Sequence, residues 1–200
     1  MENFLRNYLP IFLFAYLLIT FVLPSVRVYK QTGINPVTFG KSDNAHDYIG
    51  GVMKFLTALL IGAVLLFSIS PNAYSYLNPF AYLQNEWLTY TGLIIVHLAL
   101  IWIIVAQYHM RLSWRIGIDN TNKTALITIG LFSISRNPVF LGMILSTAGI
   151  FLILPNAIML LITVTSYIVI QIQIRLEEEH LQKMHGSDYN EYKRKVKRLL

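Results

Sequence analysis

Five apolar stretches, each close to the length that crosses a bilayer, dominate this 200-residue sequence. A membrane-spanning helix needs about 20 mostly apolar residues, and the stretches run roughly over residues 8–26, 48–69, 87–107, 138–154 and 157–174. Hydrophobic residues make up 55% of the chain and charged residues only 13%, against about 25% charged residues in a typical soluble domain. The sequence therefore predicts an all-α fold, a polytopic transmembrane bundle of about five helices.

The connections between these stretches refine the predicted architecture. Only Pro155 and Asn156 separate the last two spans, which predicts a tight helical hairpin. No small-residue cleavage site follows the first stretch, so we expect it to remain as a span and not to act as a signal peptide. A polar stretch after the fifth span predicts a C-terminal helix.

Lysine and arginine residues indicate the orientation in the membrane. The loop at residues 70–86 contains none, whereas the loops after the first and third spans and the C-terminal tail contain many. Because cytoplasmic loops carry the excess of basic residues, we expect the N-terminus outside and the C-terminus in the cytoplasm. The membrane would be the inner or plasma membrane in a prokaryote and the endoplasmic reticulum in a eukaryote. The basic residues that carry this prediction are Arg27, Lys30, Lys41, Arg111, Arg115, Lys123, Arg136, Arg175, Lys183, Lys193, Arg194, Lys195, Lys197 and Arg198.

Composition also excludes several function classes. The net charge of +6 belongs largely to the basic loops and tail, which we interpret as contacts with anionic lipids and not with nucleic acid. The chain has no cysteine, which excludes disulfides and thiolate metal sites. No dinucleotide-binding or P-loop glycine pattern is present, and the five histidines lack the spacing of a zinc protease or a di-iron oxidase. We therefore predict no metal site.

Two polar clusters lie at the same end of the last two spans, and they are the candidate functional residues. The first, residues 135–142, places Asn137 before Pro138, a residue suited to the first turn of a helix. A helix N-terminus can hold an anion, and Gly142 permits a close approach. The second cluster, residues 175–181, contains Glu177, Glu178 and Glu179. Plain helix capping, a topology signal and a solvated charged face remain alternative interpretations.

The two clusters together resemble a known family. The run Arg136-Asn137-Pro138-Val139-Phe140-Leu141-Gly142, then a hairpin, then Glu177-Glu178-x-x-Leu181 with Gly186, Tyr189 and Tyr192, resembles the isoprenylcysteine carboxyl methyltransferase family. Related phospholipid N-methyltransferases share much of this pattern. The resemblance covers residues 124–198. It implies an integral-membrane enzyme that uses S-adenosylmethionine without a Rossmann fold and holds it at the cytosolic face.

The resemblance also implies site residues. The apolar stretches predict a single domain over residues 1–200, with three N-terminal spans in 1–110; the resemblance places the cofactor-binding part, with the hairpin and the C-terminal helix, in 111–200. The family often has His in place of Asn137 and Tyr in place of Phe140, and an arginine that meets the substrate carboxylate falls opposite Gln173. The implied catalytic residues are Arg136, Arg175, as a substitute for that arginine, and Glu178. The implied cofactor-binding residues are Thr124, Ala125, Leu126, Ile127, Phe132, Asn137, Pro138, Val139, Phe140 and Glu177.

The chemistry of the methyl acceptor leaves alternatives open. The resemblance implies methylation of the carboxylate of a lipophilic, isoprenylcysteine-like substrate, either a small molecule or a lipid-modified one. A carboxylate is ionised at neutral pH and needs no base, and arginine can hold it by two parallel hydrogen bonds. A phospholipid amine must first lose a proton, for which Glu178 and His180 are candidate bases. A non-catalytic membrane protein with the same fold is the third alternative. The sequence does not predict the oligomeric state.

Overall fold

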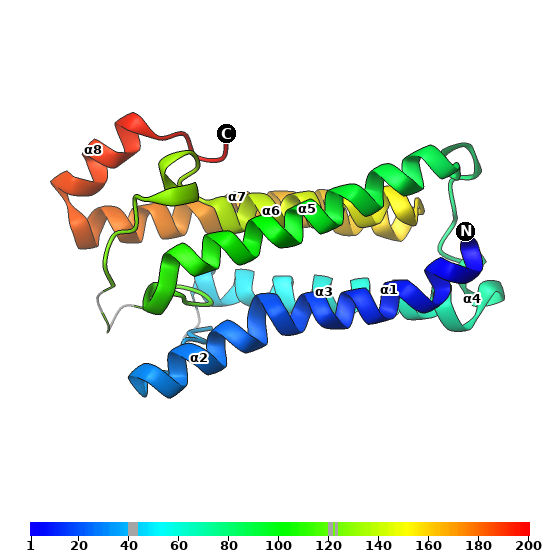
Figure 1. Ribbon diagram of the computed structural model, residues 1–200, viewed down its shortest axis with the longest axis horizontal. Helices are drawn as coiled ribbons and strands as arrows, with labels where there is room; N and C mark the ends of the chain where they lie inside the picture. The colour runs from blue at the N-terminus through cyan, green and yellow to red at the C-terminus, as the bar shows by residue number, and fades with distance from the viewer. Residues whose placement is uncertain (40–43, 120–121, 123) are drawn as a thin grey trace.

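The protein is an elongated bundle of helices in the computed structural model, which describes residues 1–39, 44–119, 122 and 124–200 (Figure 1). Within these ranges the chain forms helices and three isolated bridges but no strand. The predicted all-α membrane bundle is confirmed. Lys41 and Lys123, which contributed to the expected orientation, lie outside the described residues.

The first pass is one long helix composed of α1 (Glu2–Leu17), a π-helical turn η1 (Leu18–Val22) and α2 (Leu23–Thr32). It is longer than the predicted stretch at residues 8–26. Pro24 has no N–H to offer the carbonyl of Thr20 four residues earlier. The Gln107 side chain donates to that carbonyl instead, at 2.6 Å. The Thr20 carbonyl thus keeps a hydrogen-bond partner inside the bundle. Single π-helical turns of this kind are frequent near functional sites.

The next two passes begin at asparagine caps. In α3 (Ala45–Ile69) the Asn44 side chain accepts a hydrogen bond from the Asp47 N–H at 2.9 Å. After the short helices α4 (Pro71–Ser75) and η2 (Ala81–Leu83), the third pass α5 (Glu86–Met110) begins in the same way at Asn85, and the turn η3 (Arg111–Ser113) follows it. Such caps satisfy N–H groups that a helix start leaves unpaired.

The predicted hairpin is present. After the turn η4 (Gly130–Ser133), helix α6 (Pro138–Ile153) runs away from the candidate site and α7 (Ala157–His185) returns to it. Helix α7 continues well beyond its expected apolar end at residue 174. Gly186, with φ of 54°, separates it from the C-terminal helix α8 (Ser187–Lys195).

Four of the passes are long and apolar enough to span a membrane: Glu2–Thr32, Ala45–Ile69, Glu86–Ser113 and Ala157–His185. Helix α6 is shorter, and its 16 residues cover about 24 Å at 1.5 Å per residue. Five passes place the N-terminus and α8 at opposite ends of the bundle (Figure 1). The chain is therefore an integral membrane protein.

Glycines bring α5 and α6 into close contact. A Cβ atom added at Gly92 of α5 would lie 2.6 Å from the carbonyl oxygen of Gly149 in α6, and one added at Gly142 would lie 2.4 Å from Ile103. Small residues of this kind let membrane helices approach backbone to backbone. The close approach that the sequence predicted at Gly142 is made by α5, and it fixes the start of α6 against the end of α5.

Candidate active site

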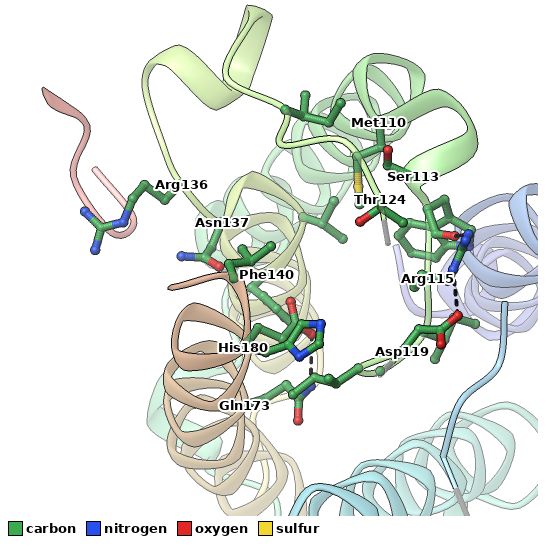
Figure 2. Close-up of a pocket in the computed structure, with 18 of the residues that line it drawn as sticks. Met110, Ser113, Arg115, Asp119, Thr124, Arg136, Asn137, Phe140, Gln173 and His180 are labelled. Atoms are coloured by element: carbon green, nitrogen blue, oxygen red, sulfur yellow. Dashed lines mark hydrogen bonds and ion pairs between the residues drawn. The ribbon is translucent and has the colours of Figure 1, made fainter. Parts of the chain in front are cut away.

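A cavity of about 190 Å³ lies at the end of the bundle opposite the N-terminus. Its walls come from the end of α5 and the segment that follows, the start of α6, the last turns of α7, and Tyr192 of α8. Figure 2 shows this arrangement, with Asn137 and Phe140 on one side of the cavity and Arg115 and Asp119 on the other.

The residues that the resemblance assigns to the cofactor all line this cavity. They come from three parts of the chain: the extended segment before η4 together with η4 itself, the start of α6, and α7. The folded chain brings together Thr124, Ala125, Leu126, Ile127, Phe132, Asn137, Pro138, Val139, Phe140 and Glu177.

Asn137 begins α6 but does not cap it. Its side chain makes no capping hydrogen bond and donates instead to Oε1 of Glu178 at 3.3 Å and to the backbone oxygen of Arg198 at 3.1 Å. The plain capping interpretation of this asparagine is therefore wrong. Pro138 supplies the first residue of the helix, and its carbonyl accepts a hydrogen bond from Trp102 of α5 at 2.9 Å.

One face of α7 forms the second wall of the cavity. Gln173, Glu177, His180, Leu181 and Met184 line it, at the three- and four-residue spacing that places side chains on one side of a helix. The Gln173 amide nitrogen donates to Oε1 of Glu177 at 2.9 Å. This wall thus combines a carboxylate, an amide and an imidazole with apolar side chains.

Glu178 points to another side of α7 and does not line the cavity. Arg136 donates from Nε and Nη2 to its Oε1 at 3.0 and 2.8 Å. Arg198 donates from Nε and Nη2 to its Oε2 at 3.1 and 2.8 Å. These hydrogen bonds raise the pKa of the Arg198 guanidinium above its usual value. Nearby, burial raises the pKa of the Tyr189 hydroxyl to about 12. The cluster is a buried ion-pair network behind the cavity wall.

Arg175 is also outside the cavity. Its side chain is exposed and donates to the backbone and side-chain oxygens of Gln171 on its own helix, at 2.6 and 3.0 Å. Among the three residues that the resemblance assigned to catalysis, Arg136 alone lines the cavity. In Figure 2 its guanidinium is directed away from the other labelled residues.

A third, polar wall was missed in the sequence. It comes from η3 and the segment after it, where Arg115 Nε lies 3.5 Å from Asp119 Oδ2, and the Asn122 side chain donates to the same oxygen at 2.9 Å. His180 lies across the cavity and interacts electrostatically with Asp119 (Figure 2). Arg115 had been interpreted only as a topology signal, although a charged pair four residues apart was visible in the sequence.

The first half of the chain contributes to the cavity as well. Phe21 of η1, Phe39 and Met53 of α3 line it. The start of α3 is held to the segment after α5, because the Ile118 N–H donates to His46 Nε2 at 2.8 Å. The candidate site therefore extends beyond residues 111–200.

A second, smaller cavity of about 70 Å³ adjoins the first inside the bundle. Phe21, Met53 and Met143 line both cavities. The other residues around the smaller cavity are mostly apolar and come from α1, α3, α6 and α7: Leu13, Tyr16, Leu17, Leu56, Thr57, Leu60, Ser146, Thr147, Ile150, Ile162, Ser166 and Ile170. The larger cavity thus shares part of its wall with an apolar chamber among the spans.

Comparison with protein-family models matches residues 87–188 to the phospholipid methyltransferase family. The match is half of the chain and runs from the start of α5 into α8. It therefore contains most of the described cavity wall. No curated protein matches the sequence.

Proposed function

The chain belongs to the phospholipid methyltransferase family, and from that premise we propose that it is a membrane methyltransferase that uses S-adenosylmethionine to methylate a lipophilic acceptor. The family match indicates methyltransferase activity in general. The observation that supports the specific cofactor is that ten residues, assigned to it by resemblance alone, surround one cavity. We place this cavity at the cytoplasmic face, on the basis of the basic residues in the adjoining loops.

The residues of the cavity fit the cofactor chemically. S-adenosylmethionine carries an ammonium group, hydroxyls, an aromatic base and a methyl group on a sulfonium that is a good leaving group. Glu177 and Asn137 offer polar atoms, and Phe132 and Phe140 offer rings against which a base can pack. The cofactor needs no activation, so the protein would act mainly by orienting the two reactants.

A lipophilic acceptor is supported by the chamber next to the cavity. A membrane-dissolved molecule could place its apolar chain in this chamber and its reactive headgroup beside the polar side chains of the larger cavity. Phe21, Met53 and Met143 stand at the junction. Methionine side chains adapt to irregular apolar ligands, so this junction suits an alkyl or prenyl chain.

The headgroup that the geometry favours is a phospholipid amine. An ammonium near pKa 10 must lose a proton before it can attack a methyl group, and His180 lines the cavity opposite Asp119. The arginines expected to hold a carboxylate are less suitably placed. Arg175 lies outside the cavity, and Arg136 is bonded to Glu178.

A carboxylate of the isoprenylcysteine kind is the second candidate acceptor, because Arg115 stands in the cavity wall. Its guanidinium donates to the carbonyls of Leu112 and Trp114 and pairs with Asp119. A substrate carboxylate would have to share this arginine with Asp119.

The test is methyl transfer from labelled cofactor by the detergent-purified protein. Calorimetry measures cofactor binding first, and labelled product is then collected with phospholipid amines and with prenylcysteine analogues. Base-stable label on a phospholipid headgroup supports the first candidate. Label released as methanol by mild base supports the second, because only an ester is cleaved in this way. A folded protein that binds no S-adenosylmethionine would contradict the proposed function.

A further inference from the structure

The last residues of the chain are joined to the start of α6 by an unusually dense set of bonds. Ser135 and Lys197 form a parallel bridge, and the Arg136 N–H donates to the Lys197 carbonyl at 2.9 Å. Arg136 Nη1 also donates to the carbonyl of Val196. We call residues 196–198 the C-terminal strap. It lies directly behind residues 135–137, two of which line the cavity.

Glu178 joins the strap, α7 and the start of α6 through one carboxylate. Its Oε1 accepts from Arg136 and Asn137, and its Oε2 accepts from Arg198. A carboxylate has about four lone-pair sites, and five N–H contacts occupy this one. The Glu178 side chain is only 6% exposed. It therefore has no free lone pair with which to take a proton from a substrate.

Burial makes the three donors to Glu178, which are Arg136, Asn137 and Arg198, depend on one another. Ser135 is fully buried and Asn137 is 8% exposed. A buried charge that loses its partner is strongly unfavourable. Removal of Arg198 would leave Glu178 with Arg136 and Asn137 only, and it would release the strap from its side-chain attachment to α7. The backbone at residues 135–137 would then lose part of the support that sets its position at the cavity, because only its own bonds to residues 196–198 would still hold the strap.

We propose that the C-terminal strap is part of the cofactor site. In this proposal Glu178 is a positioning residue: its Oε1 holds Arg136 and Asn137 in the cavity wall, and its Oε2 holds the strap through Arg198. This inference rests on the proposed function only in so far as the cavity holds S-adenosylmethionine. It assigns Glu178 a different role from the catalytic one that the resemblance implies. It also gives a function to the final residues of the chain, which the matched range 87–188 does not include.

The first test compares two arginines of the tail. Arg198→Gln removes the strap's ion pair and is a mild change, because its side chain is 34% exposed. Arg194→Gln is the matched control, since Arg194 is exposed on α8. Arg198→Gln should weaken S-adenosylmethionine binding at least tenfold by calorimetry, and Arg194→Gln should leave it unchanged. Equal affinities in two folded variants would overturn the proposal.

The second test replaces the lost ion pair with a covalent bond. Residues paired between adjacent extended segments lie about 4.8 Å apart, within the Cα separation of roughly 4.4–6.8 Å that a disulfide requires. Because the chain has no native cysteine, Ser135→Cys and Lys197→Cys can be introduced together in the Arg198→Gln background. Oxidation should restore cofactor affinity, and reduction should return it to the weakened level of Arg198→Gln. Failure of the disulfide to restore affinity would mean that Arg198 does not act by holding the strap.

A third measurement, the alkylation rate of a cysteine behind the strap, tests the position of the strap without cofactor binding. Ser135 is fully buried behind the strap, so the single variant Ser135→Cys should react slowly with an alkylating reagent. Addition of Arg198→Gln should make this reaction at least tenfold faster. If the wild-type protein binds no S-adenosylmethionine but this acceleration is seen, the proposed function fails while the strap is supported. Equal alkylation rates would overturn the strap itself.

Discussion

The Gln173 amide nitrogen donates a hydrogen bond to the Glu177 carboxylate, 2.9 Å away and one turn further along α7, and both side chains line the cavity. Consecutive residues of a helix point about 100° apart, so the next residue, Glu178, leaves this face and reaches Arg136 and Arg198. Glu179 is exposed and pairs with Lys183. Three adjacent carboxylates thus occupy three different environments, and only that of Glu177 is suited to a ligand in the cavity.

Glu177→Ala should therefore weaken S-adenosylmethionine binding. A hydrogen bond to a charged group contributes about 1.5–3 kcal/mol, and each 1.4 kcal/mol is about tenfold in affinity, so a loss of roughly tenfold or more is expected by calorimetry. Glu179→Ala is the control. It removes a surface ion pair, which contributes about 0–1 kcal/mol to stability, and it should leave the affinity unchanged. A folded Glu177→Ala protein with wild-type affinity would remove this residue from the site.

His180→Gln should reduce methyl transfer to a phospholipid amine without changing cofactor affinity. General-base catalysis typically contributes about 10²–10⁴-fold in rate, so a fall in kcat of at least a hundredfold is expected. The titratable groups that interact electrostatically with His180 are Asp119 from the segment after α5, His46 from α3, and Lys183 and His185 from α7.

The pH dependence separates a base from a structural role for His180. A base must be neutral to accept a proton, so wild-type activity should fall as the pH drops through the pKa of the histidine. The His180→Gln variant should gain activity only at higher pH, as the acceptor amine loses its own proton. Rates are measured from pH 5.5 to 9.5, a range chosen to include the reference pKa of histidine, about 6.5. A variant that keeps the wild-type pH profile would show that His180 is not the base.

The sequence predicted the bundle because length and apolar content are sufficient to define a membrane span. It predicted the ends of the spans less well. The first span was predicted over residues 8–26, yet the helix continues through Pro10 and Pro24, from Glu2 to Thr32. The Gln107 side chain donates a hydrogen bond to the Thr20 carbonyl that Pro24 leaves without a helix partner. This bond comes from a neighbouring helix, so the sequence of the first span does not predict it.

The cavity wall was predictable where its residues form a compact motif. The residues that the resemblance assigns to the cofactor lie in short runs that the fold brings to one cavity, and their role stays a prediction. The wall formed by Arg115 and Asp119 was missed, because its position opposite α7 depends on tertiary packing. Glu178 was assigned to catalysis because it is part of the motif Glu177-Glu178-x-x-Leu181 and is a candidate base. The second oxygen of the Glu178 carboxylate accepts from Arg198, which is 20 positions further along the chain. The motif that contains Glu178 therefore does not predict this partner.

Gly92→Ala should destabilise the bundle. The added Cβ would lie 2.6 Å from the Gly149 backbone oxygen, which cannot move as a flexible side chain can. Overpacking in a tight core costs about 1–3 kcal/mol, so a lower thermal unfolding temperature in detergent is expected. Gly62→Ala in α3 is the control, since nothing lies within 4 Å of its added Cβ. Equal unfolding temperatures for the two variants would show that α5 and α6 do not pack as closely as described.

Single cysteines introduced at opposite ends of the bundle should be labelled from opposite sides of the membrane. Tyr82 is 79% exposed in the connection before α5, and Ser187 is exposed at the start of α8. The basic residues concentrate near α8, so a membrane-impermeant maleimide should label Tyr82→Cys in sealed cells. Ser187→Cys should be labelled only after permeabilisation. The chain has no other cysteine to confuse the result. The reverse pattern would invert the predicted orientation, and labelling of both from one side would contradict the three passes, α5, α6 and α7, between Tyr82 and Ser187.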